Sequence, residues 1–336
     1  MVVLHKVHGS QNRFFLLDQT TLEQPLTDPE LVALAQQMTH PKTGLLNGAD
    51  GILVVNASNH DNVLGQMRVI NADGSEASMC GNGLRTVSRY LAEKYHSNQF
   101  KVETLTADLQ VSRQSDLATD VPAFSVEISP VRFNQTAFPF DHLGGETLID
   151  APVRAFADGL TFTAIAVPNP HLISFVDTTT MNGPLLGDLG ARLNRPNRYF
   201  PDGVNVSFAQ ILGPDQLFVR TFERGVGFTN ACGTGMSATS LAFAMTHPQL
   251  GHFGRQMTIY NPGGMVKTVV HHSESRDTIE LIGNATETHL ITVDEAQLHQ
   301  ANVTEATATV ATTHEEAAYE AFVAGLPSVS AIAVKE

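Results

Sequence analysis

The sequence predicts an α+β fold made of two related domains and a short appendage. The chain has 336 residues, more than one ordinary domain needs. Predicted strands, a glycine-rich turn, a helix and further strands occur twice in the same order. The two cysteines, Cys80 and Cys232, each open a Cys-Gly-x-Gly turn, and their 152-residue separation is about the length of one domain. We therefore expect halves at 1–130 and 131–297, each bringing one thiol to a shared cleft, and an Ala/Thr-rich tail at 298–336.

The first half begins with an expected strand and loop. Apolar residues at helical spacing predict a helix over 26–40, which Asp28 is expected to cap. Strands are expected at 51–57 and 66–72, before the first glycine-rich turn. The helix after that turn is expected to run to about His96. Its apolar face is expected to consist of Leu84, Val87, Leu91 and Tyr95.

The second half repeats this order. Strands are expected within 162–176, 204–212 and 216–225, and a helix follows the second glycine-rich turn. Two more strand regions follow, and the last strand is a candidate to return to the first half. In the tail, Thr313 and Glu316 have the spacing of a capping box for a short helix. The tail is expected to carry no catalytic residues.

Composition narrows the functional class. The formal net charge of −14 argues against a nucleic-acid partner, which favours a basic face. No run approaches the ~20 apolar residues of a membrane helix, and the start lacks the apolar region of a signal peptide. The sequence therefore predicts a cytoplasmic protein that acts on a small molecule. In a reducing compartment two thiols indicate chemistry rather than a structural disulfide.

The Cys-Gly-x-Gly frame is suited to acid/base chemistry on an anion. The first turn of a helix carries unpaired N–H groups and partial positive charge, which eases ionisation of a thiol placed there. The glycines let an anion approach the backbone closely. Each turn is therefore predicted to supply one acid/base thiol and N–H donors for a carboxylate.

Two such turns facing each other predict racemisation or epimerisation. One thiolate removes the α-proton from one face of a substrate, and the opposite thiol delivers a proton to the other face. Fixed N–H dipoles stabilise the charge that develops on the carboxylate, so no pyridoxal phosphate or other cofactor is expected.

Other uses of two thiols explain less. A Cys-x-x-Cys redox pair is absent, and no four ligands stand at the short spacing of a zinc site. His271 and His272 are adjacent on a predicted strand, so their rings point to opposite faces, and we expect no bound metal. A Cys-His-Asn protease using His171 leaves the second cysteine unexplained. A disulfide between Cys80 and Cys232 that blocks catalysis stays open as a side reaction.

The motifs, taken together and in order, resemble the diaminopimelate epimerase family over about residues 5–290. Residues 71–85 and 223–235 resemble its two cysteine signatures. Smaller segments resemble its N-terminal loop, its Asn-Pro-His motif, a further asparagine strand and its closing strands; they are 8–18, 168–171, 200–208, 261–264 and 281–286.

The resemblance implies a fold, a reaction and a set of residues. The implied fold is two pseudo-symmetric α+β domains, each a curled, mostly antiparallel sheet around a central helix, with the active-site cleft between them. The implied reaction is cofactor-independent epimerisation of LL-2,6-diaminopimelate to meso-diaminopimelate, in lysine and cell-wall precursor biosynthesis. Cys80 and Cys232 are implied as the catalytic acid/base pair. His171 and Glu223 are implied to tune the thiols.

The same resemblance assigns the substrate contacts. Backbone groups of four residues are implied to hold the reacting carboxylate: Gly81, Asn82, Gly233 and Thr234. The far end of the substrate, or its surroundings, is assigned to polar side chains: Asn12, Asn71, Asn169, Asn205, Glu223 and Arg224. Arginine binds a carboxylate bidentately, and an amide both donates and accepts, which suits a mixed ammonium and carboxylate target.

The sequence departs from the family pattern at Gln11, Arg13, Phe228 and Asn284, and in its tail. These departures bear on local packing and rate rather than on the type of reaction. Two alternatives stay open: a proline or hydroxyproline racemase-type enzyme with the same two-thiol logic, and an inert amino-acid-binding protein. Whether the chain forms a homodimer also stays open.

Overall fold

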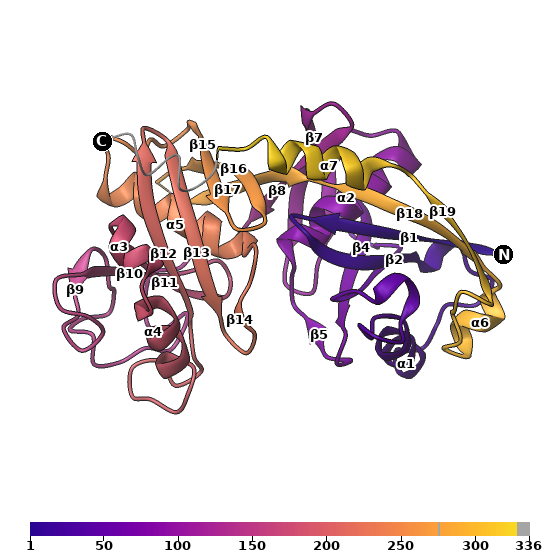
Figure 1. Cartoon of the computed structure of the whole chain (residues 1–336), viewed down its shortest axis with the longest axis horizontal. Coiled ribbons are helices and arrows are strands. Elements are labelled where there is room, and N and C mark those ends of the chain that lie inside the picture. The colour runs from indigo at the N-terminus through magenta and orange to yellow at the C-terminus, as the bar shows by residue number, and fades with distance from the viewer. Residues whose placement is uncertain (275, 328–336) are drawn as a thin grey trace. The chain divides into compact units, whose positions relative to one another are not determined.

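The computed structural model describes residues 1–274 and 276–327, which form two compact units (Figure 1). The first unit comprises Met1–Val126 and Ile282–Gly325, and the second comprises Glu127–Leu281. The chain passes between them inside two strands, β8 (Val121–Ile128) and β17 (Thr278–Asn284). None of the helices in the described ranges is long and apolar enough to cross a membrane.

The first unit is a curled sheet of mostly antiparallel strands. From one edge the pairing runs β19–β18–β1–β2–β3–β4–β6–β7–β8, and only β2–β3 and β4–β6 are parallel. Its other elements are the short strand β5 beside β4 and the helices α1, α2, α6 and α7. Besides β8, the bounds are β1 Val2–Gly9, β2 Asn12–Asp18, α1 Asp28–Met38, β3 Gly51–Asn56, β4 Val63–Asn71, β5 Glu76–Ala77, α2 Gly81–Tyr95, β6 Gln99–Glu103, β7 Asp108–Ala118, β18 Thr286–Val293, α6 Glu295–His299, β19 Ala308–Thr312 and α7 Glu315–Ala324.

The second unit repeats this plan. The pairing runs β9–β10–β11–β12–β13–β15–β16, with β14 beside β13, and only β11–β12 and β13–β15 are parallel. Besides β17, the bounds are β9 Ala151–Pro152, β10 Thr161–Ala166, β11 Pro170–Phe175, α3 Thr178–Asn182, α4 Leu185–Leu193, β12 Asn205–Gly213, β13 Gln216–Glu223, β14 Gly227–Phe228, α5 Gly233–Thr246, β15 Gln256–Asn261 and β16 Gly264–His271.

One helix lies at the centre of each unit. α2 packs on β1, β2, β3, β4 and β7, and α5 packs on the corresponding side of its own sheet, from β10 to β16. The first eight residues of α2 and nearly all of α5 are buried. A helix that is buried on all sides lies inside a core rather than on its surface. The predicted curled sheet around a central helix is confirmed for both units.

The structure corrects two details of the predicted helices. The cap of α1 is Thr27 rather than Asp28: Glu30 accepts from both the backbone N–H and the hydroxyl of Thr27, at 2.7 Å each. Asp28 lies in the first turn instead, where a negative charge suits the helix dipole. Tyr95, predicted on the apolar face of α2, is 46% exposed because it stands in the last turn, beyond the sheet.

The segment after Leu281 lies with the first unit. β18 pairs with β1 along seven residue positions, and β19 pairs with β18. Figure 1 shows these strands, orange to yellow, beside the indigo N-terminal strands. The predicted capping box of the tail helix is wrong. α7 begins after His314, the Thr313 hydroxyl donates to the Glu287 carbonyl, and Glu316 contacts side chains of the first strands instead.

Candidate active site

Cys80 is the N-cap of α2, as the glycine-rich turn predicts. Its backbone is extended (φ −140°, ψ 109°), and its Sγ accepts from the N–H of Gly83 at 3.4 Å. The N–H groups of Gly81 and Asn82 belong to the first turn, where a helix provides no acceptor of its own. The structure thus places a half-exposed thiol beside helix donors that point out of the first turn.

Asn12 reaches the same place from the turn between β1 and β2. Its Oδ1 lies 3.5 Å from Cys80 Sγ and accepts from Asn82 Nδ2 at 3.3 Å. Its Nδ2 donates to Asp50 at 2.6 Å, which fixes the orientation of the amide. Asn82 is 5% exposed, and its Oδ1 has no hydrogen-bond partner. A buried, unsatisfied acceptor is costly, so this oxygen is suited to receive a donor from a ligand.

Asn71 stands at the end of β4. Its Nδ2 donates to Ser75 Oγ at 3.0 Å, and its backbone N–H and C=O close the turn to β5. It is half-buried. The structure therefore gives Asn71 a turn-forming role, with its Oδ1 as the group left for a ligand.

Cys232 is the N-cap of α5 and has the same extended backbone (φ −110°, ψ 101°). It is more buried than Cys80, at 6% exposed, and its Sγ lies 3.6 Å from Thr234 Oγ1. Burial, followed by the nearby Glu223 carboxylate, raises the pKa of the Cys232 thiol well above its ordinary value. Hydrogen bonds from Thr234 and Gly235 oppose that rise without cancelling it.

Glu223 ends strand β13 beside this thiol. Burial raises the pKa of its carboxyl, while hydrogen bonds from Thr229 and Cys232 lower it in part. The Thr229 hydroxyl donates to Glu223 Oε1. The Glu223 carboxylate therefore disfavours the Cys232 thiolate, whereas the Cys232 thiol, as a hydrogen-bond donor, favours the charged form of Glu223.

His171 and its neighbours form the rest of this half-site. His171 is fully buried, and its Nε2 lies 3.1 Å from Asn169 Oδ1. Burial, with a smaller contribution from Arg224, lowers the pKa of His171 to about 3, so the ring is neutral at physiological pH. Its Nδ1 has no hydrogen-bond partner. Like Asn82 Oδ1, this nitrogen is a buried polar atom that a ligand would satisfy.

Asn205 and Arg224 come from the paired ends of β12 and β13. Asn205 Oδ1 accepts from the backbone N–H of Arg224 at 2.7 Å. The Arg224 side chain is exposed, and its Nη1 donates to the Asp202 carbonyl at 2.9 Å. Asn205 is thus committed to holding the backbone at Arg224, whose guanidinium keeps further N–H groups to offer.

The last glycine of each motif stands where a side chain would not fit. A Cβ at Gly235 would lie 2.9 Å from Thr221 Oγ1 and 3.2 Å from Cys232 Sγ. A Cβ at Gly83 would lie 2.7 Å from Leu53 Cδ2. Both glycines therefore let the helix start pack closely on its sheet, which explains why the two thiols share one frame.

Strand register shows which residues of the two units correspond. The parallel strands β2 and β3 of the first unit correspond to β11 and β12 of the second. Phe14 lies opposite Gly51 in one pair, and His171 lies opposite Asn205 in the other, so Phe14 corresponds to His171. Asn12 and Asn169 each lie two positions before these residues. Two further correspondences follow. Asn71 at the end of β4 corresponds to Glu223 at the end of β13, and Cys80 at one helix cap corresponds to Cys232 at the other. The half-sites are thus built alike, but at these equivalent positions the second has His171 and Glu223 where the first has Phe14 and Asn71.

Sequence reasoning missed the residues that hold these side chains. Asp50 orients Asn12 and also accepts from the backbone of Arg13, and Thr229 binds Glu223. Asp50 precedes β3 by one residue, next to the end of β4, and this position depends on strand pairing that local patterns do not reveal. Thr229 lies six residues after Glu223 in the signature itself. A predicted hairpin between β13 and β14 would have indicated that Thr229 returns to Glu223.

The other predicted features have partners of their own. His271 binds Glu280 at 2.9 Å and His272 binds Asp277 at 2.7 Å, so each ring has its own partner. Within 1–274 and 276–327 no three His, Cys, Asp or Glu side chains are grouped to hold a metal ion. Phe228 packs edge-on against Phe222 in the hairpin of β13 and β14 and is 52% exposed.

Comparison with known proteins agrees with this architecture. The sequence profile of the diaminopimelate epimerase family matches residues 4–127 and 163–288. A diaminopimelate epimerase of Ligilactobacillus salivarius is 53% identical over 323 residues, covering 96% of this chain and 98% of that protein. One of Lactiplantibacillus plantarum is 52% identical over 329 residues, covering 97% and 98%. The profile ends at 288, whereas both relatives align well beyond it.

Solved structures of much lower identity share the fold. A phenazine biosynthesis protein of the PhzF family from Bacillus anthracis has a TM-score of 0.59 at 13% identity, covering 85% of this chain and 96% of that one. A probable proline racemase from Agrobacterium radiobacter has a TM-score of 0.57 at 14% identity, covering 89% and 96%. The profile match to both units, joined to relatives more than half identical along nearly the whole chain, shows that this chain belongs to the diaminopimelate epimerase family.

Proposed function

We propose that this chain converts LL-2,6-diaminopimelate to meso-diaminopimelate by two-thiol acid/base catalysis, in lysine and cell-wall precursor biosynthesis. The observation that carries the proposal is the repeated half-site: each unit places one cysteine at the N-cap of its central helix. The names of the relatives at 53% and 52% identity support the choice of substrate.

The chemistry needs one thiolate and one thiol on opposite faces of the same α-carbon. The thiolate takes the α-proton, and the electron pair of the broken C–H bond moves into the substrate carboxylate. First-turn N–H groups of both helices, at Gly81, Asn82, Gly233 and Thr234, stabilise that charge. The opposite thiol then donates its proton to the α-carbon, which inverts the centre and leaves the two thiols with exchanged roles. No cofactor takes part in these steps.

The pKa shifts support a starting state for one thiol. Because burial and Glu223 raise the pKa of Cys232, this residue is a protonated acid at neutral pH. We assign it the proton donor role in the turnover that begins from the resting enzyme, with Cys80 as the base. In the reverse turnover the substrate ammonium, placed near Cys232, favours the thiolate there.

The far end of the substrate is assigned to polar groups with unused capacity. The Arg224 guanidinium suits the distal carboxylate, and the amides of Asn169 and Asn71 suit the distal ammonium or carboxylate. Asn12 and Asn205 hold neighbouring groups in place, Asn12 beside Cys80 and Asn205 beneath Arg224. A cyclic amino acid such as proline has no distal amino-carboxylate for this set to bind.

The proposal requires that the two units enclose one substrate, which excludes water from the reacting carbon. It also requires reduced thiols, which fits a cytoplasmic location. We include a homodimer in the proposal, and sedimentation of the full chain tests it.

Deuterium exchange tests the proposed function. The reduced protein is incubated in heavy water with LL-diaminopimelate, with meso-diaminopimelate and with proline. We expect deuterium at the α-carbon of diaminopimelate alone, and we expect Cys80→Ala and Cys232→Ala each to abolish epimerisation. Absence of exchange in folded, reduced protein contradicts the proposal, and exchange into proline alone favours a proline racemase-type activity.

A further inference from the structure

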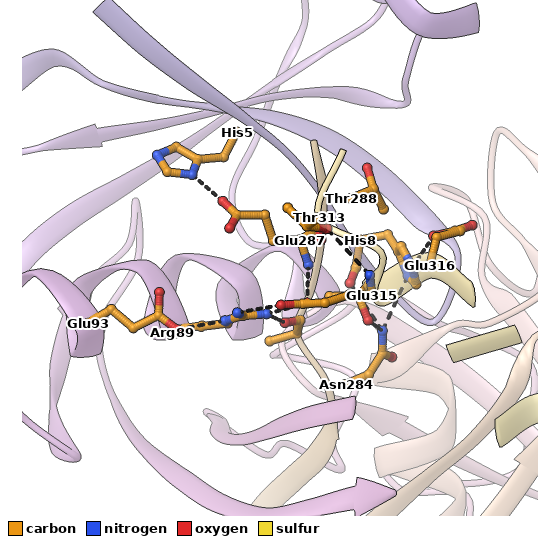
Figure 2. A network of polar contacts seen from close by, with 12 residues as sticks. His5, His8, Arg89, Glu93, Asn284, Glu287, Thr288, Thr313, Glu315 and Glu316 are labelled. Carbon is orange, nitrogen blue, oxygen red and sulfur yellow. Dashed lines mark hydrogen bonds and ion pairs between the residues drawn. The ribbon is translucent and has the colours of Figure 1, made fainter. Parts of the chain in front are cut away.

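The tail helix α7 binds the strand pair that carries Asn12. Glu316 Oε1 accepts from Arg13 Nη2 at 2.9 Å, and Glu316 Oε2 lies 2.8 Å from His8 Nε2. Figure 2 shows Glu316 beside His8, and Glu315 directed toward Arg89 of α2. The two contacts of Glu316 lie on either side of the turn between β1 and β2. One carboxylate of the tail therefore ties together both strands of that hairpin.

The hairpin turn has backbone angles that need such support. Ser10 and Gln11, its two central residues, have φ of 52° and 65°, a conformation that favours glycine. The N–H of Ser10 donates to Asn284 Oδ1 at 2.8 Å, and the N–H of Gln11 donates to His8 Nδ1 at 3.3 Å. The His8 ring, which is fully buried, thus supports the turn at one nitrogen and faces the tail at the other.

Tyr319 adds a second link from the tail. It is 1% exposed, its ring packs edge-on against His8 at 4.7 Å between centroids, and its hydroxyl is hydrogen-bonded with Ser10. Ser10 Oγ also accepts from Arg85 Nη2 at 3.1 Å. Arg85 lies on α2, five residues after Cys80, and is fully buried. Ser10 is therefore held by two residues, Tyr319 of the tail helix α7 and Arg85 of the helix α2.

The tail is bound directly to α2 as well. Arg89 donates to both carboxylate oxygens of Glu315, at 2.6 and 2.7 Å, and Glu315 also accepts from the backbone N–H of Glu287 at 2.9 Å. A bidentate pair of this kind fixes orientation as well as distance. α7 is thus fastened both to the hairpin that carries Asn12 and to the helix that begins at Cys80.

We propose that α7 is a positioning element for catalysis, which holds the amide of Asn12 against the thiol of Cys80 through Glu316 and Tyr319. Asn12 lies only two residues after Ser10 and one before Arg13, the two points that the tail binds. When these contacts are lost, the turn moves and Asn12 Oδ1 leaves both Cys80 and Asn82. The inference rests on the proposed function for its kinetic consequence, but the geometry at Cys80 is testable by itself.

The test compares Glu316→Gln, Tyr319→Phe and a matched control, Glu320→Gln, which changes an exposed carboxylate of the same helix. Each variant is assayed for kcat and KM with diaminopimelate. The alkylation rates of Cys80 and Cys232 by iodoacetamide are measured peptide by peptide. Cys232 lies in the other unit and serves as the internal control.

We expect the first two variants to lose about tenfold in kcat with little change in KM, because a misplaced catalytic group costs rate rather than binding. Cys80 should be alkylated faster than in the parent chain, since its thiol loses the amide acceptor, while Cys232 should keep its rate. Glu320→Gln should change neither. Equal behaviour of Glu316→Gln, Tyr319→Phe and the control overturns the inference.

A rise in alkylation at both cysteines also overturns it, because that result reports a general loss of packing. An Arg13→Gln variant, which removes the same ion pair from the other side, should change Cys80 in the same direction as Glu316→Gln. If the parent chain shows no epimerase activity, the proposed function fails. The alkylation comparison then still decides whether the tail positions Asn12.

Discussion

At the scale of single residues, the two thiols are alike in backbone and unlike in surroundings. Each cysteine follows the end of an equivalent strand by nine residues, but that end is Asn71 in one unit and Glu223 in the other. Glu223 and burial raise the pKa of Cys232. The repeat therefore supplies the geometry of a symmetric acid/base pair, and deeper burial of Cys232, together with Glu223 in place of Asn71, gives its thiol surroundings that Cys80 does not have.

Replacement of Glu223 by glutamine should lower the pKa of the Cys232 thiol. The carboxylate disfavours the thiolate, so its removal favours ionisation, while burial, the larger cause, stays. The pH dependence of iodoacetamide alkylation at Cys232 measures the shift, and Cys80 in the same variant is the control. We expect kcat to fall about a hundredfold, the typical effect of disturbing an acid/base group. An unchanged alkylation profile would show that Glu223 is not charged beside the thiol.

At the scale of elements, local patterns predicted what local physics decides. The two glycine-rich turns, the helices that follow them and the strands at 51–57 and 66–72 are confirmed as α2, α5, β3 and β4. The predictions failed where a side chain binds a residue far away in the sequence instead of its local partner. Glu316 has the right spacing to cap α7, yet His8 and Arg13, three hundred residues earlier, bind its carboxylate instead.

The docking of α7 against β1 and β2 should weaken at acid pH. The close contact with His8, together with Arg13, lowers the pKa of Glu316 to about 2, below the value of ~4.3 for an unfolded glutamate. A lowered pKa means that the stabilisation is complete above about pH 5 and is lost as the pH falls through about 2.

Urea unfolding of the parent chain and of Glu316→Gln measures this effect. We expect the parent to be more stable by about 1 kcal/mol at pH 7, since the carboxylate is partly exposed and the pair is partly screened. The difference should shrink steadily below pH 4. A difference that stays constant down to pH 2 would mean that the charge of Glu316 contributes nothing.

At the scale of the whole molecule, the two-domain α+β fold and the repeat were predictable because the motif pair marks them in the sequence. The register that brings Asn12 to Cys80 was not, because it depends on the parallel pairing of β2 with β3, two strands that are not consecutive hairpin partners. Two of the noted departures from the family pattern, Arg13 and Asn284, both lie in the network around α7. Sequence alone offered no reason to connect them.

Native-state hydrogen exchange should report the membership of β18. Because β18 pairs with β1 and carries β19, its amides should open together with those of β1 and β2. They should not follow the amides of β12 and β13 in the second unit. A denaturant series on the full chain separates the two groups of amides. If the amides of β18 opened together with those of the second unit, this grouping would be contradicted.

The first unit is built from two separate segments of the chain, and this sets an order of folding during synthesis. The strands that pair within the second unit, β9 to β16, all lie in the continuous stretch Glu127–Leu281, so they have all left the ribosome when the end of that stretch emerges. The first unit must wait, because the partner of β1 lies at Thr286–Val293. Until then β1 is an exposed edge strand, the kind of surface that pairs with other chains. Nascent chains should therefore need protection at their N-terminal half for most of translation, although that half is made first.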